Sequence, residues 1–110
     1  MRDLKKAAGF LAVVFAVLAI TAAPTRATET TVKIENFTFE PQVLTVPVGT
    51  KVTWVNDDDI PHLVAEKDGK FRSAALDTND TYSETFSTPG TIEYYCAIHP
   101  HMTGKIVVTQ

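Results

Sequence analysis

Two sulfur-containing side chains and an imidazole follow each other at three-residue intervals near the end of this 110-residue chain, at Cys96, His99 and Met102. Thiolate, thioether and imidazole groups suit copper, whereas hard cations prefer carboxylate oxygens. The alternating segment 91–96 predicts a strand that delivers Cys96 inward at its end. Pro100 then favours a tight turn after His99. A chain that gathers these side chains at one point is strongly restricted in its fold.

A further donor has to come from another part of the chain, and His62 is the one histidine upstream. Each residue also has an ordinary interpretation: Cys96 as a small buried hydrophobe, Met102 as a core filler and His62 as a surface histidine. The spacing favours ligation, because two histidines, a cysteine and a weak axial methionine form the blue copper arrangement. We therefore predict that His62, Cys96, His99 and Met102 bind one copper ion as Cu(II) or Cu(I).

Short alternating segments fill the chain after residue 27. They predict strands over residues 31–39 (with a break near Asn36), 43–48, 51–56, 62–66, 82–86, 91–96 and 105–109. Trp54, the single tryptophan, is expected at the centre of the core. Residues 71–76 fit either a short helix or an irregular crossover. Seven to eight short strands predict an all-β Greek-key β-sandwich, whose connections bring His62 and Cys96 to one end.

The first 27 residues have the layout of a secretory signal peptide. A positively charged start precedes an apolar run over residues 7–23, and the small residue Ala27 offers a cleavage point. An uncleaved membrane anchor is the alternative, but a run of 17 residues is at the short limit for a span. We predict a cleaved signal peptide over residues 1–27, followed by one copper-binding domain, residues 28–110, in the periplasm.

The predicted domain is acidic and has a single cysteine. Four of the 10 Lys and Arg residues and one of the 13 Asp and Glu residues precede residue 28, so residues 28–110 carry a formal charge of −6. This charge disfavours nucleic-acid binding and suits a basic partner. One cysteine cannot form an internal disulfide, but a metal that joins distant segments can stabilise a small domain. The acidic run 57–59 predicts a solvated turn rather than a calcium loop.

These features together resemble the cupredoxins, the family of blue copper proteins, and in particular its amicyanin and plastocyanin groups. The resemblance rests on the Cys96-x-x-His99-x-x-Met102 spacing with Pro100 after the histidine, and it extends over segments 43–56, 88–91 and 104–108. It implies a cupredoxin-like sandwich, one copper ion and the four ligands named above. It also implies that His99 lies at the surface, where an electron would leave.

Four residues depart from the family pattern. One of them is Ile98, which stands where amicyanins have proline and so offers a backbone N–H near the thiolate. Leu63 and Ala97 stand where the family usually has polar residues, directly after the first histidine and the cysteine, that tie the two ligand segments together. An apolar contact is expected to replace that tie. His101 stands where amicyanins have an aromatic residue, and we expect it at the surface beside the site rather than on the metal.

Three strong ligands and one weak ligand leave no open position for a substrate, so we expect an electron carrier and not an enzyme. The resemblance implies redox partners such as a c-type cytochrome or a periplasmic dehydrogenase, for example methylamine dehydrogenase. A monomer would meet them through an apolar patch of Ile60, Pro61, Pro100 and Met102. A periplasmic copper carrier or sensor with the same ligands stays open, as does a structural sandwich with incidental Cys and His.

Overall fold

The computed structural model describes residues 28–110, and the predicted signal peptide lies outside the described residues. The described part consists of strands and connections, with no helix that could cross a membrane. The eight strands are β1 (Glu29–Glu35), β2 (Thr38–Glu40), β3 (Val43–Pro47), β4 (Thr50–Asn56), β5 (Val64–Glu66), β6 (Thr81–Phe86), β7 (Gly90–Cys96) and β8 (His99–Thr109). The prediction of an all-β domain with seven to eight strands is confirmed.

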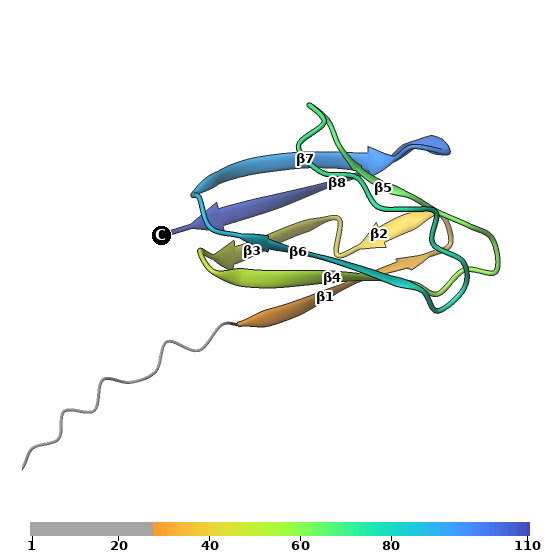
Figure 1. Cartoon of the computed structure of the whole chain (residues 1–110), viewed down its shortest axis with the longest axis horizontal. Helices are drawn as coiled ribbons and strands as arrows, with labels where there is room; N and C mark the ends of the chain where they lie inside the picture. Colours follow the sequence, from red (N-terminus) through yellow and green to blue (C-terminus); the bar gives the residue numbers. More distant parts are fainter. Residues whose placement is uncertain (1–27) are drawn as a thin grey trace, which may run out of the picture.

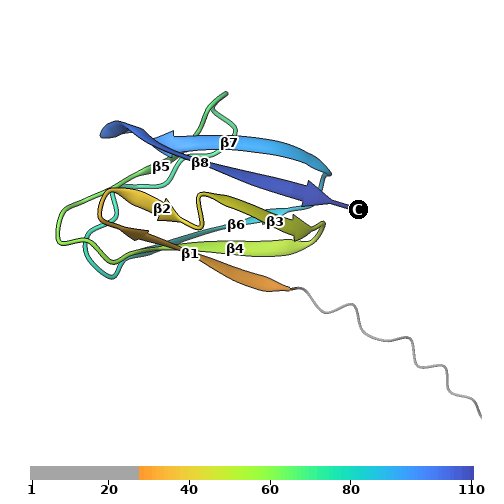
Figure 2. The ribbon, with the colours of Figure 1, turned by 180° about the vertical axis from the view of Figure 1, so that it is seen from behind.

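The strands form two four-stranded sheets, ordered β2-β1-β4-β6 and β3-β8-β7-β5. The pairs β1–β4 and β3–β8 are parallel and the remaining pairs are antiparallel, which requires connections that cross between the layers. The two layers face each other in Figures 1 and 2. The β1–β2 turn, the β4–β5 connection and the junction of β7 with β8 lie together at the end away from the C-terminus (Figure 1). This arrangement confirms the predicted sandwich.

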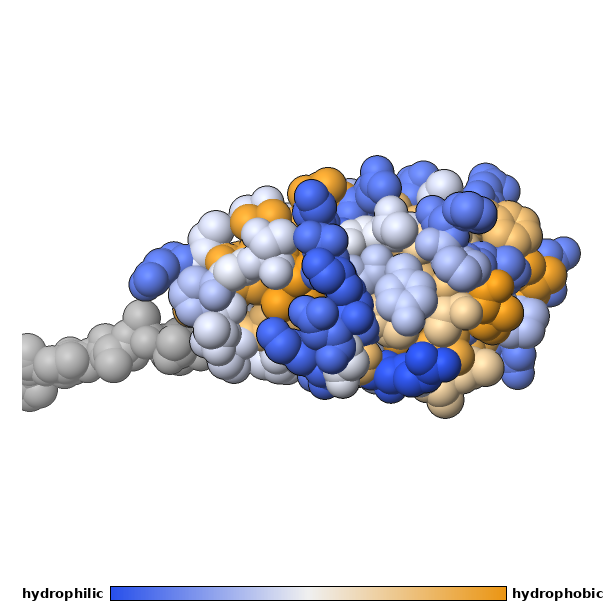
Figure 3. Space-filling model, turned by 90° about the horizontal axis from the view of Figure 1, so that it is seen from above, coloured by the Kyte–Doolittle hydropathy of each residue, from blue (hydrophilic) through white to orange (hydrophobic). Residues whose placement is uncertain are grey.

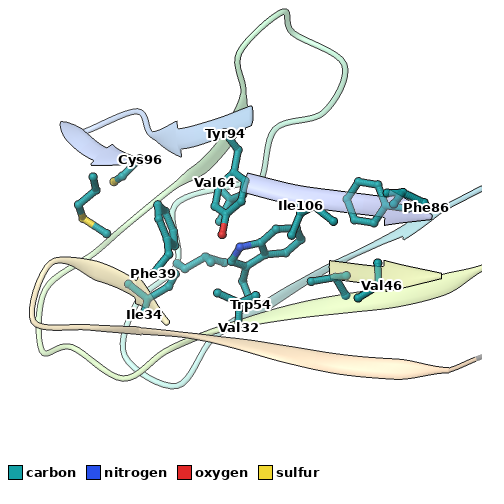
Figure 4. Packing of buried hydrophobic residues seen from close by; sticks show 14 residues of the cluster. Val32, Ile34, Phe39, Val46, Trp54, Val64, Phe86, Tyr94, Cys96 and Ile106 are labelled. Carbon is teal, nitrogen blue, oxygen red and sulfur yellow. The ribbon is translucent and has the colours of Figure 1, made fainter. Parts of the chain in front are cut away.

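Side chains that alternate between buried and exposed along the central strands fill the space between the sheets. In β4 every second residue is fully buried, including Val52 and Trp54, and in β8 Met102, Ile106 and Val108 face the interior. Trp54 is completely buried at the centre of the core, as predicted, and Figure 4 shows it among side chains from both sheets. Burial of each large apolar side chain contributes about 1.5–3 kcal/mol, so this core drives the assembly of the two sheets.

A tyrosine and a glycine lock the two longest strands of the second sheet together. Tyr94 on β7 pairs directly with Gly104 on β8, and its buried ring lies 4.7 Å from Phe39 and 5.3 Å from Trp54 between ring centroids. Figure 4 shows the Tyr94 hydroxyl next to the Trp54 indole nitrogen. Neither atom meets the geometric criteria for a hydrogen bond with any partner within residues 28–110. Burial raises the pKa of Tyr94 to about 12, against the weaker opposing effect of the Trp54 N–H.

One turn agrees with the sequence-based expectation and one differs from it. The predicted strand over residues 31–39 is divided by a two-residue turn at Asn36-Phe37, in agreement with the predicted break near Asn36, but Phe37 is exposed instead of following the strand alternation. The tight turn near the cysteine lies at residues 97–98, before Pro100 rather than at it, because Cys96 pairs directly with His99. Residues 71–76 form the irregular crossover, pinned by isolated bridges from Leu76 to His62 and from Arg72 to Ala65.

Candidate metal centre

Two imidazoles and a thiol converge at the end of the sandwich where the long connections meet. The donor atoms of His62, Cys96 and His99 all lie within 4.8 Å of one another. The Cys96 Sγ lies 3.7 Å from His62 Nδ1 and 3.6 Å from His99 Nδ1. Cys96 and His62 are completely buried, while His99 is partly exposed. The structure therefore brings together three of the four predicted ligands, His62 from the β4–β5 connection and Cys96 and His99 from the junction of β7 with β8.

These separations fit a single soft metal ion. Metal–nitrogen bonds of about 2.0 Å and metal–sulfur bonds of about 2.3 Å, at angles between tetrahedral and trigonal, put nitrogen and sulfur about 3.5–3.7 Å apart. The observed nitrogen–sulfur distances of 3.7 and 3.6 Å agree with that range. A thiol with two imidazoles is a donor set for copper, and Zn²⁺ accepts it too. The residues present therefore suit one copper ion.

Backbone hydrogen bonds hold His62 in its place. Its N–H donates to the Leu76 carbonyl at 3.0 Å, and the Leu76 N–H donates back to the His62 carbonyl at 2.7 Å. The side-chain amide of Asn56, completely buried at the end of β4, donates to the carbonyls of Ile60 and Leu76, both at 2.8 Å. These hydrogen bonds join the β4–β5 connection to the crossover over residues 71–76. They hold His62 in place although it lies outside any regular strand.

The two ligand segments are tied together through their backbones. The Leu63 N–H donates to the Cys96 Sγ at 3.4 Å, and the Ala97 N–H donates to the Leu63 carbonyl at 3.1 Å. We expected an apolar contact between Leu63 and Ala97 to replace the polar side chains usual at these positions. The structure shows that backbone hydrogen bonds of these two residues connect the ligand segments. The Leu63 N–H also orients the sulfur, as groups outside the donor set commonly do for metal ligands.

A carboxylate behind His62 selects the tautomer that metal binding needs. The His62 Nε2–H donates to Asp58 Oδ2 at 2.7 Å, which leaves the Nδ1 lone pair free on the side of Cys96. Burial alone would raise the pKa of Asp58, but hydrogen bonds from the Phe37 and Asn36 amides and from His62 outweigh it, and the pKa lies below its ordinary value. The prediction of a merely solvated acidic turn was wrong for Asp58. No local pattern signalled this contact, because a four-residue spacing brings side chains together on a helix and not in an irregular connection.

Phe37 packs on both imidazoles, a role that the sequence pattern did not reveal. Its ring meets those of His62 and His99 edge-on, with centroids 5.5 and 5.0 Å apart. Asn36 and Phe37 have φ values of 54° and 60°, so both central residues of this turn are left-handed. Asn tolerates that conformation, but for a residue such as phenylalanine it costs roughly 1–2 kcal/mol. The backbone is therefore held in an unfavourable conformation next to the site.

The other predicted residues lie as follows. Met102 is buried on the inward face of β8, three residues after His99. It therefore cannot belong to the apolar surface patch predicted with Ile60, Pro61 and Pro100, and this part of the prediction was wrong. Pro61 and Pro100 are exposed and Ile60 is partly exposed. Phe37 and Ile98, which are 50% and 47% exposed, add further apolar surface near His99. His101 is exposed, in agreement with the expectation.

Known proteins with this sequence pattern share the fold. A model of the cupredoxin-like domain matches residues 7–108. Amicyanin-alpha of Methylorubrum extorquens is 39% identical over 95 residues, which cover 82% of this chain and 78% of that protein. Amicyanin of Paracoccus versutus is 34% identical over 94 residues, covering 81% of this chain and 71% of that protein.

Solved structures agree. A purple cupredoxin from Nitrosopumilus maritimus has a TM-score of 0.67 and 34% identity, over 73% of this chain and 99% of that chain. An oxidised amicyanin mutant has a TM-score of 0.69 and 34% identity, over 74% and 81% of the two chains. The copper-containing nitrite reductase of Thermus scotoductus SA-01 has a TM-score of 0.72 and 32% identity, but this chain covers 25% of that enzyme. The chain therefore belongs to the cupredoxin family, and its cluster of His62, Cys96 and His99 fits the single copper ion of that family.

Proposed function

We propose that this protein is a small exported type 1 (blue) copper protein that carries single electrons between periplasmic redox partners. The observation that carries the proposal is the convergence of the His62 and His99 Nδ1 atoms on a fully buried Cys96 Sγ. Copper supplies the one-electron couple when it is bound. The amicyanin relatives support the same conclusion, because they are similar to this chain in sequence and in fold.

The residues around His62, Cys96 and His99 hold these side chains in place and exclude water from two of them. Asp58 orients His62 and the Leu63 amide holds the Cys96 sulfur, so the donors need little rearrangement when an electron arrives or leaves. Burial of Cys96 and His62 excludes water from two of the three donors. In our proposal Met102, buried three residues beyond His99, is the weak axial ligand that completes the set.

His99 is the proposed exit for the electron, because it is the one of the three clustered donors that reaches the surface. Figure 3 shows apolar side chains among polar ones at this end of the molecule. Phe37 and Ile98 provide exposed apolar surface there. Such a small patch suits a transient complex with a redox protein, such as a c-type cytochrome or a periplasmic dehydrogenase.

A titration of residues 28–110 with Cu(II), followed by visible absorption, tests the proposal. We use this segment because both sheets and the whole described core lie within it. An intense thiolate-to-copper band that saturates at one equivalent and is absent from Cys96→Ser is the expected result. Without such a band the electron-transfer function is wrong.

A second measurement separates electron transfer from metal delivery. NMR line broadening in mixtures of the oxidised and reduced forms is expected to show fast electron self-exchange, and a mild Cu(I) chelator is expected to remove copper slowly. Fast loss of Cu(I) to the chelator with slow exchange would identify a copper carrier or sensor instead.

A further inference from the structure

The β1–β2 turn brings a half-exposed aromatic ring onto the imidazoles of two proposed ligands that belong to other segments. Phe37 lies on the hairpin of the first sheet, whereas His99 begins β8 in the second sheet. The centroids of Phe37, His62 and His99 are 5.0–5.5 Å apart, and all three pairs meet edge-on. Phe37 therefore closes the end of the sandwich above the donor cluster, with half of its surface toward solvent.

The turn holds this position against its backbone preference. Two-residue turns with positive φ at both central residues favour Asn-Gly, and here a phenylalanine occupies the glycine position. An aromatic residue in a left-handed conformation persists only when its surroundings impose it, and such sites often serve a function. Asn36, by contrast, is a residue that tolerates this conformation.

Asp58 is the group that imposes the conformation. Its Oδ1 accepts the Asn36 N–H at 2.7 Å, and its Oδ2 accepts the Phe37 N–H at 3.0 Å. The same Oδ2 accepts the His62 Nε2–H at 2.7 Å. One carboxylate thus fixes both the turn that carries the aromatic ring and one of the imidazoles on which that ring packs. The side chain of Asp58 is only 11% exposed, so solvent competes weakly for these bonds.

We propose that Phe37 is a positioning residue that shields the metal centre: clamped by Asp58, it restrains the His99 ring and excludes small thiol reagents and anions from the donor cluster. The proposal rests on the proposed function only in treating the cluster as a metal centre. Its first test needs no metal, because access to Cys96 is a property of the folded chain itself.

The test is the rate at which metal-free residues 28–110 react with an aromatic disulfide, 5,5′-dithiobis(2-nitrobenzoate). The Cys96 thiolate attacks one sulfur of the reagent, the S–S bond breaks, and one coloured thionitrobenzoate leaves with the electron pair. Phe37→Ala is expected to react about tenfold faster or more, since the rate of such exchange depends on access to the thiol. Phe37→Tyr, which keeps the ring, is expected to stay within about twofold of the unchanged chain.

Val43→Ala is the matched control, because Val43 is another exposed apolar residue, 54% exposed, and makes none of the ring contacts described here. Its rate is expected to stay unchanged. Asp58→Ala is expected to speed the reaction as Phe37→Ala does, and the double variant should react no faster than Phe37→Ala alone, because the clamp acts through the ring. An accelerated double variant would overturn that part of the proposal.

Unfolding free energies of all variants decide whether the effect is local. The shielding role of Phe37 is wrong if Phe37→Ala does not react faster. It is also wrong if the increase in reaction rate is no larger than the loss of unfolding free energy explains, because Cys96 would then react through global unfolding. With copper bound, Phe37→Ala should also bind added imidazole or azide more tightly than the unchanged protein, seen as a shift of the visible spectrum. If Phe37→Ala reacts faster with the disulfide but the protein shows no thiolate-to-copper band, Phe37 shields Cys96 and the proposed electron-transfer function is wrong.

Discussion

Replacement of Gly104 by alanine tests the packing beneath the metal centre. A Cβ at this position would lie 2.3 Å from Tyr94 Cζ, 2.4 Å from its hydroxyl oxygen and 2.8 Å from Cε1. Ordinary contacts of this kind begin at about 3.4 Å, so the ring or the strand has to move by about 1 Å. Phe39 and Trp54 pack on the Tyr94 ring at 4.7 and 5.3 Å between centroids, which leaves it no space to move into.

The expected loss of unfolding free energy is therefore at the upper end for an overpacked core, about 3 kcal/mol. Urea unfolding of residues 28–110 without metal, followed by the fluorescence of Trp54, measures this loss. Gly69→Ala is the control, because Gly69 has open space around its Cα and a φ of 84°. That variant carries backbone strain only, and should lose about 1 kcal/mol.

A double variant locates the clash. Tyr94→Leu removes the ring atoms that the new Cβ would meet, so Gly104→Ala should be far less harmful in that background, with a coupling energy of about 1–3 kcal/mol. A loss below about 1 kcal/mol for Gly104→Ala alone, or strictly additive effects, would refute the argument that a rigid Tyr94 ring requires glycine on the opposite strand.

Three further changes test other groups. Because burial raises the pKa of Tyr94 to about 12, its stabilising contribution is present below pH 10 and is lost as the pH rises toward 12, by about 2–3 kcal/mol. Tyr94→Phe should therefore reduce the alkaline loss of stability in urea unfolding at pH 8–12, where Tyr82 also contributes because its pKa is raised as well. An unchanged dependence would contradict the prediction. Asp58→Asn should weaken Cu(II) binding roughly 10–100-fold, because the carboxylate no longer imposes the tautomer of His62. Competition with a chelator measures the Cu(II) affinity, and an equal affinity would argue against the role of Asp58. Met102→Leu should change the unfolding free energy by less than about 1.5 kcal/mol, because leucine keeps the volume of this buried side chain. It should raise the reduction potential, because it removes a proposed donor to Cu(II). An unchanged potential in a redox titration would exclude axial ligation by Met102.

The regular part of this fold could be predicted because its rule is local. In a strand, successive side chains point to opposite faces, so the burial of Val52 and Trp54, and of Ile106 and Val108, follows from counting residues. The same pattern predicted a break near Asn36, but it did not predict the left-handed conformation of Phe37 or its exposure. Phenylalanine favours strands, and its left-handed conformation depends on Asp58, which lies 21 residues further along the chain.

By itself the sequence determined the donor types and their spacing, because Cys96 and His99 are close in the chain wherever the chain goes. It also determined the acidic charge and the all-β class, since these depend on composition and on alternation with a period of two. Only the tertiary structure decided how His62 meets Cys96 across 34 residues. It also decided that backbone amides tie the ligand segments together, and that Asp58 and Phe37 support the imidazoles. The physical reason is that hydrogen bonds and ring contacts between distant residues depend on how the two sheets pack, which no local pattern encodes.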